Sequence, residues 1–291
     1  MTSVVIREMT TEDLDCVDGS GGAGGFGDRC DFFRMAISLG DCHPVVAVAD
    51  GRVVGTGLGA VHGEVGWLGV VFVVPELRRR GIGRAITETL CDGLKRVGCS
   101  SLVLVATDMG KPVYDRLGFQ EQSQYHMFSG EPLAEMPSPP PGTLLSQIRP
   151  VDIGAVADLD RRATGEDRLA LIRSFARSGW LLEDEPDGCV RDHIDAAGPG
   201  LRGFLLPTSR GNAALVARSA EDAACLLDLH RHLTPAGNRA WAGLATENAA
   251  GRHLLAERGW YSWRSFPRMF RGEEPAWQPD MIWGEFNHAM G

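Results

Sequence analysis

Apolar residues in the first 130 positions follow the two periods that a mixed sheet with packed helices requires. Short β-branched runs predict strands at 4–7, 45–49, 53–61 and 65–74. An apolar repeat at helical spacing predicts a helix from 82 to about 97, and the apolar run 101–106 predicts a strand buried on both faces. A short helix that ends at Gly118 and a strand from Phe119 complete a mixed α/β layout.

A proline-dense segment divides the chain. The sequence GEPLAEMPSPPPG continues neither a helix nor a central strand, and 291 residues approach the limit of about 250 to 300 for one core. We therefore expect an N-terminal domain at 1–130, a Pro-rich linker at 131–144 and a C-terminal domain at 145–291. Each domain is expected to be α/β, a twisted mixed sheet flanked by helices.

Composition and charge narrow the class of protein. Hydrophobic residues at 44% and charged residues at 23% are typical of a folded, soluble protein, and no apolar run reaches the ~20 residues of a membrane span. A net charge of −9 opposes binding to a phosphate backbone, so no nucleic-acid partner is expected. The seven cysteines include no CxxC pair, and the start of the chain lacks a secretory pattern, which indicates a cytoplasmic protein. The histidines form no HExxH pattern, so no metal is expected.

A basic, glycine-containing turn before the helix at 82 is the clearest candidate site. Pro75 stops the preceding strand, and Gly81 and Gly83 let the backbone approach a ligand closely. Amides at a helix N-terminus, with the positive end of the dipole, form an anion site. Four arginines crowd the same turn: Arg78, Arg79, Arg80 and Arg84. A pyrophosphate would neutralise their repulsion, whereas a solvated arginine cluster is the alternative interpretation. The glycine-rich residues 19–27 lack GK[ST] and indicate a loop beside a substrate opening.

The spacing Arg78-x-x-Gly81-x-Gly83 after a strand resembles the (Q/R)xxGx(G/A) signature of the GNAT superfamily of N-acetyltransferases. The resemblance implies acetyl-CoA as cofactor, with its pyrophosphate on the loop amides and its pantetheine arm along the preceding strand. The implied cofactor-binding residues are Val71, Phe72, Val73, Arg78, Arg79, Arg80, Gly81, Ile82, Gly83 and Arg84.

A second stretch, from Thr107 to Phe119, resembles the NxxAxxxYxxxGF ending of the same superfamily. It implies that Tyr114 lies near the thioester sulfur and acts as general acid for the departing thiolate. A half-buried aromatic without a catalytic role is the alternative. Thr107 and Gly110 depart from the usual asparagine and alanine.

Transfer from a thioester to an amine needs no covalent enzyme intermediate, so only a base remains to be assigned. Glu64, at the start of the strand that leads to the turn, is the predicted carboxylate. Asp108 and His62 are alternatives, and a carboxylate in either position is more often a solvated turn residue.

The second half repeats the first at an offset of 141 positions, which places Thr107 on Asn248 and Gly118 on Gly259. The candidate catalytic tyrosine is not repeated in the second half, because Tyr114 aligns with Leu255 at this offset. Ser219-Ala-Glu-Asp222 predicts a capped helix start, which satisfies its own amides and repels phosphate. We expect a degenerate copy that has lost cofactor binding at that turn. Asp158 and Asp160 are interpreted as helix surface, and Asp167 as a helix N-cap, instead of a calcium loop.

The sequence thus predicts a tandem enzyme whose first domain transfers an acetyl group to a primary amine, on a small molecule or on a protein. A non-catalytic acyl-CoA-binding module and an O-acyltransferase are the alternatives. No membrane partner is expected, and a homodimer is left open.

Overall fold

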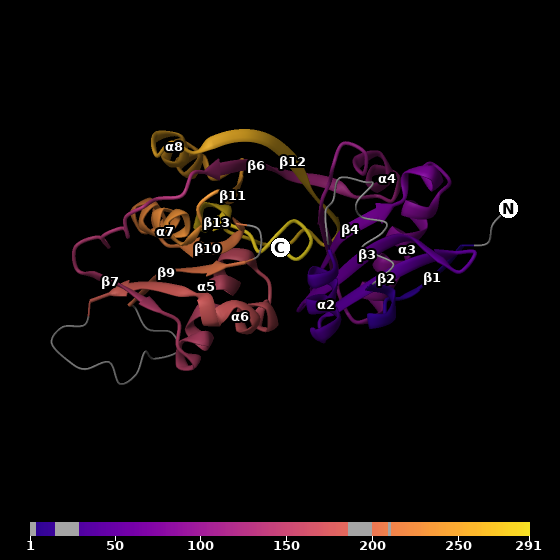
Figure 1. The fold of residues 1–291 in the computed structure, drawn as a ribbon, viewed down its shortest axis with the longest axis horizontal. Coiled ribbons are helices and arrows are strands. Elements are labelled where there is room, and N and C mark those ends of the chain that lie inside the picture. Colours follow the sequence, from indigo (N-terminus) through magenta and orange to yellow (C-terminus); the bar gives the residue numbers. More distant parts are fainter. Residues whose placement is uncertain (1–3, 15–28, 186–199, 209–210) are drawn as a thin grey trace. The chain divides into compact units, whose positions relative to one another are not determined.

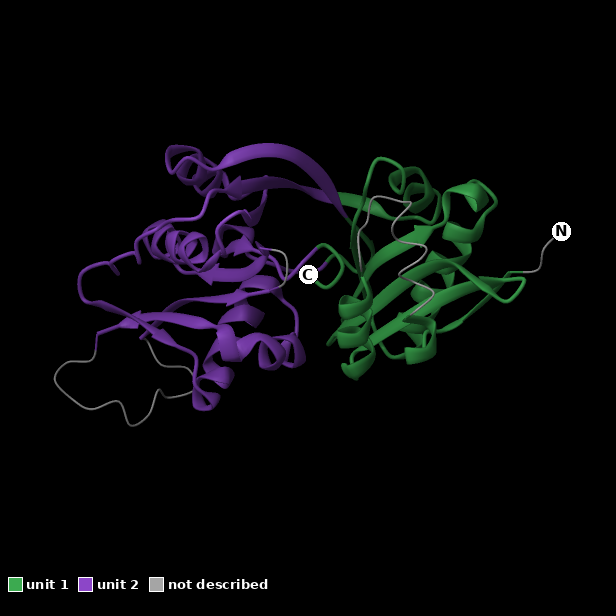
Figure 2. Cartoon of the chain, in the orientation of Figure 1, with its two compact units in different colours: residues 1–121, 269–274, 288–290 green, residues 122–268, 275–287, 291 purple. Residues whose placement is uncertain are grey.

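A computed structural model describes residues 4–14, 29–185, 200–208 and 211–291 of the protein. The glycine-rich loop predicted at 19–27 lies outside the described residues. The chain forms two compact units (Figure 2). Unit 1 comprises Met1–Glu121, Met269–Glu274 and His288–Met290, and unit 2 comprises Gln122–Arg268, Pro275–Asn287 and Gly291.

Unit 1 is built on an antiparallel run of four strands followed by a parallel fifth (Figure 1). These strands are β1 (Val4–Glu8), β2 (Cys42–Ala49), β3 (Arg52–His62), β4 (Val65–Val73) and β5 (Ser101–Val105). The helices of this unit are α2 (Cys30–Ser38), α3 (Ile82–Arg96) and α4 (Lys111–Arg116). The strand at 101–106 is buried as predicted, with Leu102, Val103 and Leu104 at most 1% exposed.

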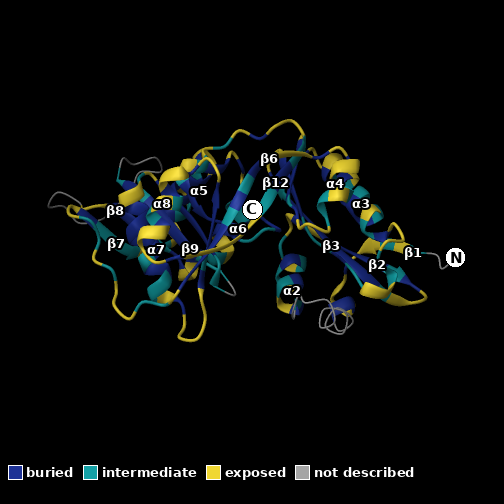
Figure 3. Ribbon diagram, turned by 90° about the horizontal axis from the view of Figure 1, so that it is seen from above, coloured by how far each residue is buried: buried dark blue, intermediate teal, exposed yellow. Residues whose placement is uncertain are grey.

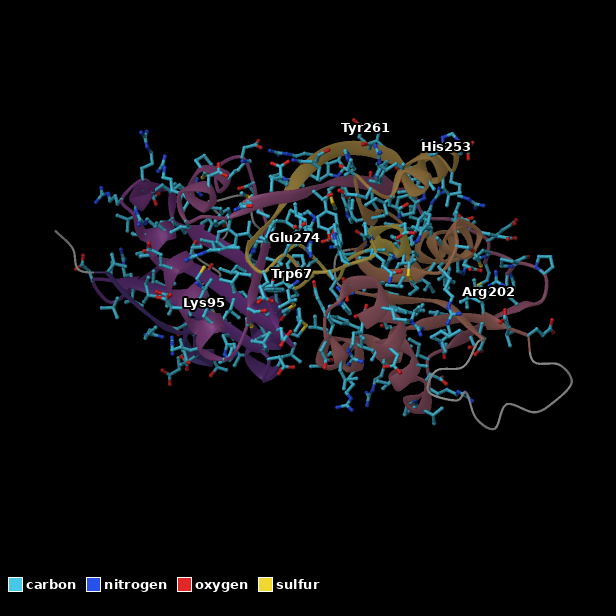
Figure 4. The ribbon with its side chains drawn as sticks, turned by 180° about the vertical axis from the view of Figure 1, so that it is seen from behind. Trp67, Lys95, Arg202, His253, Tyr261 and Glu274 are labelled. Atoms are coloured by element: carbon cyan, nitrogen blue, oxygen red, sulfur yellow. The ribbon has the colours of Figure 1, made fainter. Side chains whose placement is uncertain are left out.

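The helix α3 packs closely on β3 because glycines of that strand leave room for it. A Cβ on Gly57 would lie 2.6 Å from Cγ2 of Ile86. The inner side of α3 is buried, whereas Lys95 at its end, labelled in Figure 4, is exposed. Figure 3 shows the same division, with dark blue strands and exposed residues on α3 and α4. This is the amphipathic arrangement that the helical repeat predicts.

The core of unit 1 also contains a residue from far along the chain. Met269, near the end of β12 (Tyr261–Gly272), is fully buried in the cluster that holds Ile86, Leu102 and Phe119. Beyond it, the backbone amide of Glu273 donates to the carbonyl of Ser100 at 3.1 Å. Residues 269–274 therefore belong to unit 1 beside β5, and β12 stands between β5 and β6 in the strand order.

Unit 2 contains a five-stranded sheet within the described residues, in the order β13-β10-β9-β8-β7. Its strands are β7 (Thr143–Gln147), β8 (Trp180–Asp184), β9 (Leu201–Pro207), β10 (Ala213–Ala217) and β13 (Ile282–Gly284). The unit also has β6 (Gln120–Gly130) antiparallel to β11 (Ala240–Ala245). Its helices are α5 (Ile153–Thr164), α6 (Leu169–Phe175), α7 (Ala220–Leu233) and α8 (Ala249–Glu257).

Both units are α/β, with sheets flanked by helices, which confirms the predicted fold class. The sheet of unit 1 is mixed, whereas the five-stranded sheet of unit 2 pairs antiparallel throughout. The compact units nevertheless change over at Glu121, because β6 pairs with β11 of unit 2, and residues 131–144 also belong to unit 2. The predicted domain boundaries, at residues 130 and 144, stay a prediction from the sequence. No helix in the described part of the chain is both long and apolar enough to cross a membrane.

The repeat is visible in matching local structure. After β5, the side chain of Thr107 accepts a hydrogen bond from the amide of Gly110 at 3.2 Å. After β11, Asn248 accepts from the amide of Gly251 at 2.8 Å. A glycine with positive φ follows each of the two short helices: Gly118 at 81° and Gly259 at 73°. Thr107 thus accepts from the amide three residues on, as Asn248 does in the second copy, although α4 begins after Gly110 without a side-chain cap.

One acidic residue of α5, Asp160, does not lie on the helix surface where the sequence predicts it. Asp160 is fully buried and forms a two-pronged ion pair with Arg168, at 2.6 and 2.9 Å, so it is not on the helix surface. Asp158 pairs with Arg161 at 3.2 Å and is partly exposed, and Asp167 accepts from the amide of Leu169 at 3.3 Å. Burial of Asp160 is tolerated because the guanidinium supplies both hydrogen bonds.

Candidate active site

The N-terminus of α3 is an open helix end. Gly81 is the residue before the helix and has φ of 85°, a left-handed conformation that favours glycine. Within the described residues no side chain caps this end, and its first turn holds no acid. A Cβ on Gly81 would meet no atom within 4 Å. Ile82, which is buried, anchors the turn to the core. The first amides of α3 and the positive end of its dipole therefore remain available to an anion.

The four arginines of the turn have different surroundings. Arg78 turns back, donating from Nε to the carbonyl of Val73 at 2.9 Å, with its guanidinium 5.6 Å from the ring centroid of Phe72. Arg84 pairs with Glu88 one turn along α3, at 2.9 Å. Arg79 and Arg80 are exposed on the turn itself. Two of the four predicted cations thus have protein contacts, and the exposed pair remains closest to the open helix end in sequence.

The strand β4 separates from β5 before it reaches the turn. Their parallel pairing covers Val65 to Leu68 against Ser101 to Leu104. Farther along, the amide of Val74 donates to the carbonyl of Val54 in β3 at 3.0 Å. Because backbone groups of alternate residues point to opposite edges of a strand, Val71 and Val73 direct theirs toward the β5 side. This edge is suited to pairing with an extended ligand that carries amides.

The separation coincides with a β-bulge. The register between β3 and β4 shifts between Thr56 and Leu58, opposite Val70, which has φ of 51°. The hydroxyl of Thr56 donates to the carbonyl of Val70 at 3.1 Å and holds this conformation. A positive φ at a β-branched residue is strained, and such strain gathers at functional sites.

Tyr114 lies on α4 and packs against the same core as Val71 and Val73. Its ring meets Phe119 edge to face, with the centroids 5.9 Å apart. A Cβ on Gly110 would come within 2.8 Å of the Tyr114 ring, so the glycine that departs from the family pattern makes room for it. Burial raises the pKa of Tyr114 to about 12, which keeps the phenol protonated and able to donate.

The structure does not bring Glu64 to this end of the sheet. Glu64 lies in the turn before β4, where its carbonyl accepts from the amides of Ser100 and Ser101 at 2.9 and 3.1 Å. The strand from there to the bulge at Val70 spans roughly 20 Å at about 3.3 Å per residue. Asp108, in contrast, follows the end of β5 and is exposed near the start of α4.

The third candidate base, His62, is 2% exposed, and its Nε2 lies 2.8 Å from the carbonyl of Met290. That nitrogen must donate, because a carbonyl only accepts. Sequence reasoning missed this partner, since nothing in the local pattern around residues 288–290 marks them as part of unit 1.

The corresponding helix of unit 2 is closed, as its sequence predicts. Ser219 accepts from the amide of Asp222 at 3.1 Å, and its hydroxyl donates back to the Asp222 carboxylate at 2.6 Å. Arg202 of β9, labelled in Figure 4, donates to the same carboxylate at 2.7 Å. The N-terminus of α7 therefore carries its own anion, which confirms the predicted cap.

In unit 2, the strand that corresponds to β4 has no open edge. β10 has β9 on one side and β13 on the other, with Leu215 opposite Gly284 and Val216 opposite Ile282. Trp283 in β13 is 2% exposed. The strand that would pair with a pantetheine arm in the second copy thus pairs with the chain itself.

The arrangement of residues in unit 1 suits the chemical groups of acetyl-CoA. The open end of α3 and the exposed Arg79 and Arg80 suit a diphosphate. The β5-side edge of Val71 and Val73 suits the amides of a pantetheine arm. Tyr114 supplies a protonated phenol at the same end of the sheet.

Comparison with known proteins agrees with this geometry. Residues 9–119 match the acetyltransferase (GNAT) family. A provisionally assigned acetyltransferase of Bacillus subtilis (strain 168) is 28% identical over 93 residues, or 32% of this chain, and the chain spans 63% of that relative's length.

Two solved structures share the whole fold. One, a provisionally assigned acetyltransferase from Pyrococcus horikoshii, superposes with a TM-score of 0.79 at 22% identity, over 100% of this chain and 97% of its own. The other, a tandem GNAT protein from the clavulanic acid biosynthesis pathway, has a TM-score of 0.63 at 18% identity, over 94% and 100%. Residues 9–119 thus match the acetyltransferase (GNAT) family, and the fold of the whole chain is similar to that of a tandem GNAT protein.

Proposed function

We propose that unit 1 transfers the acetyl group of acetyl-CoA to a primary amine, on a small molecule or on a protein. The observation that carries the proposal is the uncapped N-terminus of α3 next to the separated edge of β4. An acyl-CoA offers one group to each, a diphosphate to the amides and a pantetheine arm to the strand edge.

The residues of the chain would then share the work as follows. The amides of Ile82 and Gly83, with Arg79 and Arg80, hold the diphosphate. Val71 and Val73 orient the pantetheine arm, so that the amine attacks the thioester carbonyl in a fixed geometry. Tyr114 donates its proton to the thiolate as the carbon–sulfur bond breaks.

Glu64 has no part in this proposal, because it lies at the other end of β4. The amine proton therefore needs another acceptor, and Asp108 is a candidate carboxylate because it follows β5, whose end lies at the same end of the sheet as that of β4. The net charge of −9 favours a cationic acceptor over an acidic one.

Binding is tested by calorimetry with acetyl-CoA on wild type and Gly81→Asp. A carboxylate at the open helix end should abolish binding, because it repels the diphosphate and competes for the same amides. Equal affinity in the two proteins would refute the assignment of the cofactor site.

Catalysis is tested by thiol release from acetyl-CoA across a panel of amines and alcohols, with product mass to identify the acylated atom. Tyr114→Phe should lower kcat by about 10²-fold or more, because general acid catalysis contributes at least that much. Acetyl-CoA binding without turnover on any amine would favour the non-catalytic module, and an acetylated hydroxyl would favour the O-acyltransferase.

A further inference from the structure

Unit 2 contains a cavity of about 630 Å³ at the C-terminal end of α7. Its walls come from three segments of unit 2: the connection between β9 and β10, the last turn of α7, and the loop that leads from α7 into β11. Pockets that hold small organic molecules have volumes of roughly 300 to 1,000 Å³, so this cavity has the size of a ligand site.

The cavity is separate from the place that a cofactor would occupy in the second copy. That place is the N-terminus of α7, which Ser219 and Asp222 close. Leu233 and Thr234, which line the cavity, lie at the other end of the same helix. The 14 residues of α7 span about 20 Å. A ligand in the cavity would therefore bind at a position that the repeat of the fold does not explain.

The floor of the cavity is held in one arrangement by His230 and Gly211. His230 is 3% exposed, and its Nε2 donates to the carbonyl of Gly211 at 2.9 Å. Gly211 has φ of 78°, and a Cβ there would lie 2.1 Å from the carbonyl oxygen of Arg239. The same Cβ would lie 3.2 Å from Cδ1 of Trp241. The glycine thus lets the three segments meet closely, which prepares the cavity for a ligand before it binds.

Trp241 gives the cavity a flat apolar side. The residue is partly exposed, and its ring meets Trp263 edge to face, with the centroids 5.7 Å apart, which fixes its orientation. Leu233 and Pro235 add apolar surface nearby. Within the described residues, the indole N–H has no hydrogen-bond partner, so it can donate to a ligand.

The charge around the cavity favours a neutral ligand. The described residues that line it include no acid, and Arg239 is their one permanent cation. Arg239 is already compensated, because it pairs with Glu131 at 2.6 Å and donates to the hydroxyl of Ser129 at 3.1 Å. Burial lowers the pKa of His230 to about 4, so the imidazole is neutral at physiological pH.

The polar groups of the cavity offer both donors and acceptors. The side-chain amide of Asn238 is exposed and has no hydrogen-bond partner in the part of the chain that the structure describes, so it can do both. The hydroxyl of Thr208 donates to the carbonyl of Asn212 at 3.1 Å, and that of Thr234 donates to the carbonyl of His230 at 2.8 Å. Because both hydroxyl protons are engaged, the two oxygens remain as acceptors.

We propose that this cavity binds a neutral carbohydrate, with a sugar ring stacked on Trp241 and its hydroxyls bonded to Asn238, Thr208 and Thr234. A sugar matches each feature, because its ring has an apolar C–H face and its hydroxyls both donate and accept. A planar nucleoside also stacks on an indole, but its base has fewer groups that both donate and accept. The site goes beyond the proposed acetyl transfer and does not depend on it.

The test measures binding to the full chain by saturation-transfer NMR. The probes are glucose, galactose, mannose, N-acetylglucosamine and the β-1,4-linked trimer of N-acetylglucosamine, with adenosine and uridine as the competing class. We expect a sugar to bind with Kd on the order of 1 mM, because one ring makes few contacts. Acetyl-CoA affinity and Tm are measured on the same samples and should not change with the substitutions below.

Two variants test the two kinds of contact. Trp241→Ala should weaken sugar binding by about tenfold or more, because it removes the stacking face. Asn238→Ala should weaken it by about fivefold, the effect of one lost hydrogen bond, and its exposed position leaves the fold intact if Trp241→Ala fails to fold. The matched control is Tyr261→Ala, an exposed aromatic of unit 2 that is labelled in Figure 4 and does not line the cavity. It should bind sugar as wild type does.

Three results would overturn the proposal. The first is that wild type binds none of the sugars. The second is that Tyr261→Ala weakens binding as much as the cavity variants do, which would indicate stacking on any exposed ring. The third is that a nucleoside binds in a manner that depends on Trp241 while no sugar does. None of these results affects the proposed acetyl transfer, which is measured with acetyl-CoA and an amine.

Discussion

Reversing one charge at the open end of α3 should weaken anion binding there without destabilising the fold. Arg84 is the third residue of α3, the position that Asp222 occupies in the capped helix α7. The substitution Arg84→Asp therefore gives unit 1 the acid that distinguishes unit 2. It changes the local charge by two units.

The magnitude follows from Coulomb's law. At roughly 8 Å in water, one pair of unit charges is worth about 0.5 kcal/mol. Two units of changed charge acting on roughly two phosphate charges amount to about 2 kcal/mol, or ~30-fold in Kd. Stability should change little. The exposed pair with Glu88 is lost, at a cost of about 0.5 kcal/mol, while an acid in the first turn contributes about as much.

The assay is calorimetric titration with acetyl-CoA at low and high salt, with Tm measured on the same samples. The matched control is Arg96→Asp, which makes the same charge change at the exposed C-terminal end of α3, roughly 18 Å away. Screening at that distance should leave Kd close to wild type. The reasoning is refuted if Arg84→Asp binds like wild type, or if Arg96→Asp weakens binding as much.

Three further outcomes follow from particular contacts. Calorimetry should give one acetyl-CoA per chain, because α7 is capped and β13 occupies the edge of β10; two sites would contradict this account. Gly110→Ala should lower kcat with little change in cofactor affinity, since the new methyl group meets the Tyr114 ring at 2.8 Å; an unaltered kcat would show that the ring position is irrelevant. Met269→Ala should lower the free energy of unfolding in urea by about 2 to 5 kcal/mol, because the side chain is fully buried in the core of unit 1. The control Met136→Ala, at an exposed residue, should lower it by under about 0.5 kcal/mol. Equal losses in the two variants would argue against that core.

The sequence determined the features that depend on a few neighbouring residues. The strand, the basic turn and α3 follow from Pro75, Gly81 and the helical repeat. The closed start of α7 follows from Ser219 and Asp222, three positions apart. Matching hydrogen bonds from Thr107 and Asn248 to the amide three residues on likewise repeat within a local motif. Each is a relation between residues within one or two turns of backbone, so the order of residue types is sufficient to predict it.

Only the tertiary structure decided which distant segments complete each unit. Met269 enters the core of unit 1, residues 288–290 reach the bulge at Val70, and β13 fills the edge of β10. The same packing left Glu64 at the far end of β4 and buried Asp160 against Arg168. Strand pairing and burial join residues far apart in the chain, and an apolar strand has the same alternation whichever neighbour it joins. The sequence therefore predicts that such strands exist, while the choice of partner is made by the packing of the whole.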